Sequence, residues 1–562
     1  MRRILAISVL LLAALAGAGA QGRVVERTYI STDKDVYVAG DQLWYSAFCV
    51  DASAGNLSGV SSVAYIELHG PAGMVASGKV ALSEGRGAGR LQIPGTLATG
   101  NYRLVAYTAQ NEAEKGYDFN GLASKTISVF NVLSNDRVEG GVEIVEDPEY
   151  AGVLAATRPA ERADGLRLEW RDSVLTVVNL TGNPASLSLS VYHDDGIITG
   201  TNPGISDFLS LCGKVGKKQF DDSVLPEYEG EIIRGHITGF SQEMVSSLVG
   251  KYAFISTPSE KSDVYSSVID DAGRVAFFTG NIYGNKEYIC EIEGINPSLS
   301  CYVELESPFV AKGVEKPRAL KIAPSLRDAL QLRSAAMQIE RRYTADTLFD
   351  VLEVRNNHLF GNDEIAYPLD DYTRFPTMAE VFVEFIPEIR ARRWSDGTRN
   401  IQVRLGDASD VSFSREKTLM LLDGVPVFDQ QKIMDYDPLL VESVNIYPST
   451  YFIGTRSFEG VVNFVTYKHN MPGFQFGGNV RIIDYQGVSW PMAATGAGLS
   501  QLTDYPDYRQ TIYWHPLLEC EADGTIDVQC KKPDYKGRFM VVAEGISADG
   551  KPLEARTWIV LQ

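Results

Sequence analysis

The sequence predicts a mostly β, multidomain protein in which several β-sandwiches are joined to one small α+β domain. Most of the chain consists of short stretches in which apolar and polar residues alternate, which is typical of strands with one buried face. Gly, Pro and Asn residues separate these stretches and indicate turns. Helical periodicity is confined to residues 325–347 and 378–393. A chain of 562 residues has room for three to five domains of roughly 100–200 residues each.

The first twenty residues predict export. Arg2 and Arg3 precede an apolar run at residues 4–15, and the small residues at 18–20 suit a signal peptidase. The run is shorter than the roughly 20 apolar residues that a membrane-spanning helix needs. We therefore expect residues 1–20 to be a removed signal peptide. The mature chain should have no transmembrane span and should lie in the periplasm, at the outer membrane or on the cell surface.

The net charge excludes one class of partner, and the cysteine positions allow two disulfides. The formal net charge is −20 and the isoelectric point is about 4.9, and such a chain repels phosphate backbones, so we expect no nucleic-acid partner. Six cysteines lie at positions 49, 212, 290, 301, 520 and 530. In an oxidising compartment, Cys290 with Cys301 and Cys520 with Cys530 are close enough in sequence to form disulfides. Free buried thiols are an equally good interpretation.

Residues 21–133 predict the first β-sandwich, with alternating strands at 63–68 and 102–107. The glycine-rich residues 85–89 lack the Lys-Ser/Thr of a phosphate-binding loop and are expected to form a turn. The opening of this domain resembles a macroglobulin-like domain of the alpha-2-macroglobulin family. The matching residues are Thr32, Asp33, Lys34, Tyr37, Gly40, Trp44 and the stretch 99–104.

Residues 134–224 are expected to form a linker, at 140–165, followed by a second β-sandwich with strands at 166–170, 174–178 and 187–191. Residues 225–315 contain two glycine-bearing stretches, 229–238 and 270–277. These stretches resemble the carboxypeptidase regulatory-like module, which is a small β-sandwich. The resemblance implies a third sandwich at this place in the chain.

Residues 316–375 predict a helical connector. Leu326, Leu330, Met337 and their apolar neighbours recur at helical spacing, and Met337 is expected in the core. The polar residues of the same helix are expected to face water; they are Arg327, Arg333, Glu340 and Arg341. A second helix should begin at Met378, and Pro387 should kink it or end it early.

Residues 376–470 carry the most specific set of motifs in the chain. After the second helix come an apolar strand at 401–404, the stretch LLDGVPV at 421–427, a strand at 441–446 and a glycine-containing strand that ends at Lys468. In order and spacing these resemble the plug domain of TonB-dependent outer-membrane receptors. The residues that carry the plug-like motif are Arg404, Asp423, Gly424, Val425, Pro426, Glu442, Gly454, Gly460 and Lys468.

Departures from the plug pattern argue against transport. Leu405 and Ser457 stand where the family has glycines, and only 94 residues follow Lys468 (562 − 468). A transmembrane barrel needs about 20 strands of roughly 9 to 11 residues each. The resemblance therefore implies a small α+β domain that makes contacts and does not conduct.

Residues 471–562 are expected to form a C-terminal sandwich. The stretches 513–516 and 539–545 resemble macroglobulin-like strands that precede the thioester region, and Trp514 and Phe539 should lie in the core. The sequence Gly-Cys-Gly-Glu-Gln does not occur, so covalent trapping of a protease is not expected. As a whole, the chain resembles secreted multidomain proteins of Bacteroidetes-type bacteria that join macroglobulin-like sandwiches to a plug-like domain.

The sequence contains no recognised catalytic motif. Gly-x-Ser-x-Gly, His-Glu-x-x-His and Cys-x-x-Cys do not occur, and the six histidines are scattered. The acid pairs at 370–371 and 435–437 are expected to be turns or helix caps and not calcium ligands. We predict no catalytic residue, no cofactor and no metal.

The expected function is non-catalytic binding or scaffolding in the cell envelope. The predicted partner is an outer-membrane or envelope protein, contacted through the plug-like and sandwich domains. One alternative is a macroglobulin-like, protease-trapping protein without a thioester. The other is a hydrolase whose site is assembled from distant residues around His515 or His236.

Overall fold

The computed structural model divides the chain into two compact units, and the prediction of a mostly β, multidomain fold is confirmed. Unit 1 comprises Met1–Glu229, Phe309–Glu353 and Val488–Gln562, and unit 2 comprises Gly230–Pro308 and Val354–Gly487. The predicted signal peptide lies outside the described residues. The structure describes residues 23–122, 124–197, 202–239, 241–259, 263–296, 301–343, 349–352, 354, 360, 364–393, 399–405, 412–415, 417–494 and 506–562. No helix within these ranges is both long enough and apolar enough to cross a membrane.

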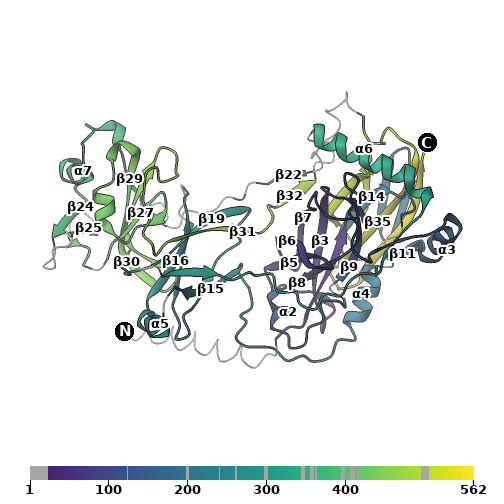
Figure 1. Cartoon of the computed structure of the whole chain (residues 1–562), viewed down its shortest axis with the longest axis horizontal. Helices are drawn as coiled ribbons and strands as arrows, with labels where there is room; N and C mark the ends of the chain where they lie inside the picture. The colour runs from purple at the N-terminus through teal and green to yellow at the C-terminus, as the bar shows by residue number, and fades with distance from the viewer. Residues whose placement is uncertain are drawn as a thin grey trace. The chain divides into compact units, whose positions relative to one another are not determined.

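The first sandwich of unit 1 packs two sheets around one apolar core (Figure 1). One sheet contains β1 (Glu26–Thr32), β3 (Gln42–Asp51), β4 (Asn56–Leu57) and β7 (Arg86–Gln92). The other, in spatial order, contains β2 (Val36–Val38), β9 (Ser124–Phe130), β8 (Gly100–Tyr107), β5 (Val63–Gly70) and β6 (Gly73–Ala81). The short helix α2 (Ala109–Ala113) follows β8. Alternation places Tyr45 and Ala47 of β3 opposite Ile66 and Leu68 of β5 in the core.

The turn predicted at residues 85–89 is only partly correct. Gly85, with φ of 76°, lies in the turn, but Gly87 and Gly89 belong to strand β7. A side chain at position 89 would lie 2.5 Å from the hydroxyl of Tyr45. The strand therefore uses glycine because the buried Tyr45 ring fills the space where a side chain would stand.

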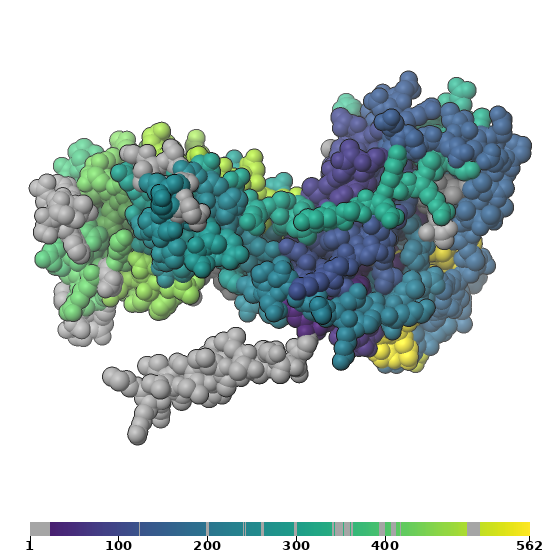
Figure 2. Space-filling view, turned by 60° about the horizontal axis from the view of Figure 1, so that its bottom comes forward, coloured from purple at the N-terminus to yellow at the C-terminus, as the bar shows by residue number. Residues whose placement is uncertain are grey.

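The second sandwich of unit 1 is made from two segments that lie far apart in the chain. Its larger sheet has the order β11 (Arg162–Asp164), β36 (Pro552–Leu561), β35 (Gly537–Ser547), β14 (Ala185–His193) and β33 (Thr511–Cys520). Its smaller sheet contains β12 (Leu166–Arg171), β13 (Val174–Asn179) and β34 (Thr525–Gln529). In Figure 1, β35, drawn in yellow, lies beside β14, and in Figure 2 yellow atoms of the C-terminal strands lie against blue and purple atoms of the early chain.

The expectation of two separate sandwiches, at 134–224 and at 471–562, is therefore wrong. Strand β14 pairs antiparallel with both β33 and β35, and β13 pairs with β34. Leu187, Leu189, Phe539 and Val541 share one apolar core. Because a strand with one apolar face must cover that face with another layer, neither segment completes a core by itself.

The segment 140–165, predicted to be a linker, contains regular elements. Strand β10 (Val142–Ile144) pairs in parallel with β21 (Leu320–Ile322), and helix α3 (Asp147–Thr157) follows β10. Helix α4 (Ile205–Cys212) packs on the first sandwich through Ile205 and Phe208, and β22 (Phe349–Val351) pairs with β32 (Met492–Ala494).

The helix predicted in the connector is α6 (Arg327–Tyr343), which follows the short helix η1 (Pro324–Leu326). Met337 is buried, as predicted. The prediction that Arg333 faces water is wrong, because its side chain is only 2% exposed. Its guanidinium donates to Asp195 Oδ2 at 2.5 Å and to the carbonyl of Val36 at 2.9 Å. Burial of this arginine is possible because a carboxylate and a carbonyl replace its water.

Unit 2 begins with the third sandwich. One sheet has the order β18 (Arg274–Phe278), β15 (Ile232–Thr238) and β20 (Tyr302–Leu305), and helix α5 (Gln242–Leu248) follows β15. The other sheet has the order β17 (Asp263–Val268), β16 (Tyr252–Thr257), β19 (Asn285–Ile292) and β31 (Arg481–Gln486). The assignment of β31 to the C-terminal domain is wrong, since it pairs with β19 and places Tyr485 in the core of the third sandwich.

The rest of unit 2 is an α+β module between β20 and β31, residues 365–466, which we call the inserted module. Its main sheet has the order β23 (Ile365–Pro368), β29 (Val441–Ile453), β30 (Arg456–Thr466), β27 (Leu419–Leu422) and β28 (Val425–Pro426). Strands β27 and β30 run in parallel. Strands β24 (Ile389–Arg393), β25 (Arg399–Leu405) and β26 (Ser412–Phe413) pair beside it.

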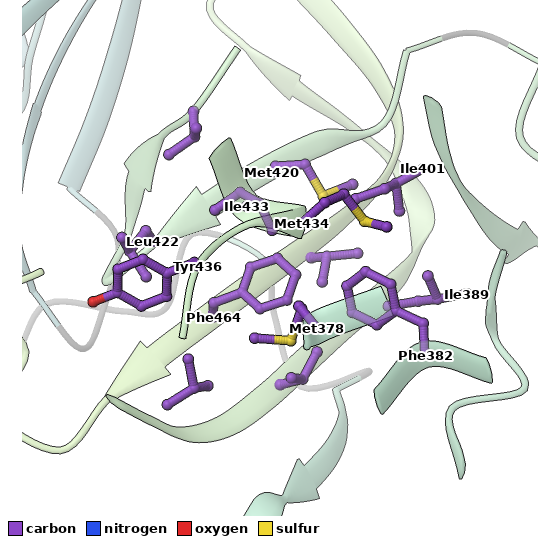
Figure 3. Close-up of a cluster of buried hydrophobic side chains, with 14 of the residues drawn as sticks. Met378, Phe382, Ile389, Ile401, Met420, Leu422, Ile433, Met434, Tyr436 and Phe464 are labelled. Atoms are coloured by element: carbon purple, nitrogen blue, oxygen red, sulfur yellow. The ribbon is translucent and has the colours of Figure 1, made fainter. Parts of the chain in front are cut away.

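Two short α-helices and two short 3₁₀ helices complete the inserted module. They are η2 (Leu369–Asp371), α7 (Met378–Phe385), α8 (Gln430–Met434) and η3 (Pro438–Leu440). As predicted, α7 ends before Pro387, but residues 389–393, the last part of the stretch expected to be helical, form strand β24. Figure 3 shows how Met378 and Phe382 of α7 and Ile433 of α8 meet Leu422 and Phe464 of the sheet in one apolar cluster.

The inserted module and the third sandwich share a second apolar cluster. Phe254 and Val264 of the sandwich pack with Leu421, Phe458 and Val461 of the module. The two parts of unit 2 therefore stabilise each other. All six cysteines of the chain are buried and free, so neither possible disulfide is formed.

Candidate functional site

Two residues of the plug-like motif, Asp423 and Gly424, form the hairpin turn that joins β27 to β28. Asp423 and Gly424 both have positive φ, at 49° and 82°, as a tight two-residue hairpin turn requires. The buried Asp423 carboxylate accepts hydrogen bonds from the amide of Thr466 at 2.7 Å, the hydroxyl of Thr466 at 2.7 Å and the amide of Met471 at 2.8 Å. The Gly424 amide donates to Asn463 Oδ1 at 3.0 Å. These bonds tie the turn to the end of β30, so this part of the motif holds the module together.

The two glycines of the motif allow close packing. At Gly460, with φ of 81°, a Cβ atom would lie 2.8 Å from Cβ of Val403, which precedes Arg404 in β25. At Gly454, with φ of 56°, it would lie 2.9 Å from the hydroxyl of Ser266 in the third sandwich. Gly454 therefore lets the β29–β30 hairpin contact the sandwich.

The structure does not bring the motif residues to one pocket. Val425 and Pro426 are buried in β28, Arg404 is half-buried in β25, and Glu442 and Lys468 are exposed. The acid pairs nearby serve locally: Asp437 accepts a hydrogen bond from the amide of Leu439 at the start of η3. In the described part of the chain, no group of three or more His, Cys, Asp or Glu side chains is placed to hold a metal ion.

The two histidines considered for a dispersed hydrolase site lie apart from the cavities described below. His515 lies on β33, where burial lowers its pKa and its Nδ1 has no hydrogen-bond partner within the described residues. His236 lies half-exposed on β15, with Glu304 at 3.8 Å and Glu306 at 3.6 Å. Neither histidine lines the two cavities of unit 1 that are described below.

A cavity of about 380 Å³ lies in unit 1 where the first sandwich meets the second, and we call it the inter-sandwich cavity. This volume is within the usual range for small-molecule sites, about 300–1,000 Å³. Its lining comes from the larger sheet of the second sandwich, from the first sandwich and from the chain between α3 and β11. The polar and charged side chains in the lining are Tyr29, Thr32, Asp35, Lys125, Thr157, Arg158, Glu161, Arg162, Tyr192, Asn202, Asp207, Glu544 and Arg556. A smaller cavity of about 80 Å³ shares Asp35, Arg158 and Tyr192 with it.

Strand alternation explains why the floor of the cavity is charged. Along β35, Phe539, Val541 and Ala543 point into the core of the second sandwich, so Met540, Val542 and Glu544 point away from it. On β36, Arg556 is paired with Val542, and on the adjacent β11, Arg162 is paired with Arg556. Two arginines directly opposite each other repel, so carboxylates must lie near them.

The two arginines are stabilised to different degrees. Arg162 lies 2.8 Å from Asp164, 3.2 Å from Asp207 and 3.2 Å from Glu554. Arg556, whose side chain is 16% exposed, lies 3.8 Å from Glu554 and 4.0 Å from Glu544. Neither distance is that of a hydrogen bond. Arg556 is therefore a largely buried cation whose two carboxylate partners lie beyond hydrogen-bond distance.

Glu544 connects the floor of the cavity to the first sandwich. Its carboxylate accepts hydrogen bonds from the hydroxyls of Tyr29 and Ser31, each at 2.8 Å, and Ser188 donates to Ser31 at 2.8 Å. Burial raises the pKa of Glu544. A little further along, the hydroxyl of Ser46 donates to the carbonyl of Pro516 at 2.6 Å. These bonds fix the sandwiches against each other and so fix the walls of the cavity.

The residues of this cavity were not among the site residues predicted from the sequence. A signal was present, because Glu544, Glu554 and Arg556 interrupt strands whose other residues are mostly apolar. Charged residues are almost never buried unless they are paired. Such interruptions indicate a group of buried polar side chains, although they do not show which strands contribute to it.

No protein-family model matches the chain, and a search of curated proteins found no match. Similar solved structures include Escherichia coli alpha-2-macroglobulin activated by porcine elastase, with 10% identity and a TM-score of 0.24 over 95% of this chain and 44% of that chain. Trypsin-activated alpha-2-macroglobulin from Escherichia coli has 10% identity and a TM-score of 0.24, over 96% and 42%. Salmonella alpha-2-macroglobulin reacted with methylamine has 10% identity and a TM-score of 0.15, over 96% and 23%. The present chain thus spans less than half the length of these proteins, and likeness at this level carries no activity over to it.

Replacing the motif aspartate should destabilise unit 2. Asp423→Ala leaves three buried donors, two of them amides, without an acceptor, and we expect the free energy of unfolding to fall by roughly 3 kcal/mol. Urea unfolding of the full chain measures this change. Asp437→Ala is the control, and loss of this exposed cap should cost about 1 kcal/mol. Equal losses for the two variants would contradict a structural role for Asp423.

A second substitution tests the electrostatics of unit 2. Burial raises the pKa of Glu291 from 4.5 to about 7, although Asn479 donates to its carboxylate at 3.4 Å. Between these two pH values the folded chain holds a proton that the unfolded chain has released. The free energy of unfolding therefore falls as pH rises from about 4.5 to 7.

Glu291→Gln should remove this contribution. The variant should match the wild type near pH 4 and exceed its stability at pH 8 by roughly 1–3 kcal/mol. Thermal unfolding at both pH values provides the measurement. Glu287→Gln, on the same strand but exposed, should behave as the wild type. An unchanged pH dependence in Glu291→Gln would rule out this carboxyl as the cause.

Proposed function

We propose that this protein is a non-catalytic binding or scaffold protein of the bacterial cell envelope. In this proposal, the inserted module contacts an outer-membrane partner and the sandwiches position it. The proposal rests on one contrast between buried and exposed side chains in the inserted module. The buried polar group of the motif, Asp423, holds the module together, while large apolar side chains of the module stay exposed. An apolar side chain held in water on a rigid element suits a contact surface.

The tip of the β29–β30 hairpin offers the best-supported contact. Phe452 is 68% exposed there. Next to it, Tyr451 lies 5.3 Å from Phe360, which in turn lies 5.1 Å from Tyr447, measured between ring centroids. This aromatic cluster stiffens the hairpin. Phe452 is therefore presented at low entropic cost, as an anchor residue of an interface requires.

The sequence is the basis for two parts of this proposal: the cell envelope as the compartment and an outer-membrane protein as the partner. The apolar run after Arg2 and Arg3 supports export, and the order of motifs from Arg404 to Lys468 supports an outer-membrane partner. Deleting the motif region would be a poor test, because Phe254 and Val264 of the third sandwich would lose their packing partners. A point substitution on the exposed hairpin avoids this problem.

Phe452→Glu should abolish partner recovery without unfolding the chain. The full-length protein is purified with a tag from solubilised envelopes of the cells that produce it. We expect the wild type to recover an outer-membrane protein in stoichiometric amount and Phe452→Glu to recover at least tenfold less. Val560→Glu, at a residue of unit 1 that is 65% exposed, is the control and should behave as the wild type.

Two outcomes would contradict the proposal. One is recovery of no outer-membrane protein by the wild type. The other is equal recovery by Phe452→Glu and the wild type, which would exclude the hairpin as the contact.

A further inference from the structure

The inter-sandwich cavity has no role in the proposed contact with an envelope partner, and its most unusual group is Arg556. A guanidinium carries five N–H donors. The nearest carboxylates, Glu554 and Glu544, lie 3.8 and 4.0 Å away, and Arg556 makes no hydrogen bond within the described residues. Its side chain is not fully buried and lines the cavity, so its N–H groups can reach a molecule held there. A ligand oxyanion in the cavity can accept hydrogen bonds from these groups at closer range than the two carboxylates do.

The other cations of the cavity already have close partners. Lys125 lies 2.9 Å from Asp35, Arg158 lies 3.2 Å from Asp194, and Arg162 contacts three carboxylates at 3.2 Å or less. Of the four cations that line the cavity, Arg556 is thus the one without a carboxylate at hydrogen-bond distance among the described residues. It lies on the rigid β36, in the middle of the floor.

The acids of the cavity limit the charge of the ligand. Asp35, Glu161, Asp207 and Glu544 line the same space. A ligand with several phosphates would bring several negative charges toward these four acids, whereas a single carboxylate brings only one. The planar guanidinium also matches a carboxylate with two parallel hydrogen bonds.

The remaining walls indicate a polar ligand body. Thr32, Thr157 and the half-buried Tyr192 line the same cavity as Arg556. The exposed Glu161 also lines it and accepts a hydrogen bond from the hydroxyl of Thr557 at 3.3 Å. Hydroxyl and amide groups of a ligand can bond to such walls.

We propose that the inter-sandwich cavity binds a small polar molecule through its carboxylate, with Arg556 as the residue that holds the carboxylate. Two sources supply this chemistry: the free C-terminus of a short peptide and a sugar acid. Both fit a cavity of about 380 Å³, and the experiment distinguishes them.

The test is titration calorimetry on the purified full chain with five probes. The probes are triglycine, triglycinamide, glucuronate, glucose and inorganic phosphate. We expect one carboxylate probe to bind and its neutral counterpart to bind at least tenfold more weakly. Binding of triglycine would identify a peptide terminus, and binding of glucuronate a sugar acid. Failure of both carboxylates to bind at millimolar concentration, or tighter binding of phosphate, would overturn the proposal.

Variants assign the binding to Arg556. Arg556→Gln should weaken binding at least tenfold, and Arg556→Lys, which keeps the charge but loses the planar fork, should weaken it less. Arg86→Gln removes an arginine that does not line the cavity and should leave the affinity unchanged. Wild-type affinity in Arg556→Gln would overturn the assignment.

A second variant separates binding from folding. Ala160 lines the cavity and is exposed, so Ala160→Trp adds bulk at the opening without a buried clash. We expect it to unfold at the wild-type temperature and to lose binding at least tenfold. Unchanged binding in Ala160→Trp would show that the ligand lies elsewhere. Because no partner protein is present, these results do not depend on the proposed envelope contact.

Discussion

Pairing of β14 with β33 and β35 is the constraint on which the rest of unit 1 depends. The strand that ends at His193 pairs with strands that begin at Thr511 and Gly537. Everything between residues 193 and 511 is therefore an insertion into one sandwich. The pairing also builds the floor of the inter-sandwich cavity, because Glu544 and Arg556 come from the C-terminal segment while Tyr192 and Arg162 come from the early one.

Polar contacts, and not only apolar packing, hold the two sandwiches of unit 1 together. Tyr29 and Ser31 of the first sandwich bond to Glu544, and Ser190 donates to the carbonyl of Asp33 at 2.5 Å. Such bonds are directional, so they specify one arrangement more sharply than apolar contacts do. A cavity with fixed walls follows from this arrangement. In unit 2 both kinds of contact join the third sandwich to the inserted module: an apolar cluster, and the ion pairs of Glu293 with Arg456 at 2.9 Å and with Lys417 at 3.2 Å.

Local sequence patterns predicted strands such as β5, β8 and β14, and they predicted where α6 and α7 lie. The alternation at residues 187–191 predicted β14, and the position of Pro387 predicted the end of α7. The partners of β14 could not be predicted, since an alternating strand shows which face is buried but not which distant strand lies beside it. For the same reason β31 was assigned to the wrong domain.

The candidate site was harder to predict than the fold. The Asp423-Gly424 turn is consistent with its local sequence, because Asp and Gly adopt positive φ more readily than most residues. Burial of Arg333 was missed, since helical periodicity alone places an arginine in water and its partner Asp195 comes from a distant loop. The cavity around Arg556 was not predicted, because its lining comes from β1, β9, β14, β35 and β36. These strands are far apart in the sequence, and a local pattern does not show that they are close in space.

The most direct test of this account is the folding of the isolated fragment 471–562. If this fragment were an independent sandwich, it would give a near-ultraviolet circular dichroism signal and a cooperative thermal transition. The account predicts neither, because β33 and β35 are separated by β14 in the sheet and β34 has only β13 as its partner. A cooperatively folded fragment would contradict the assembly of the second sandwich from two distant segments.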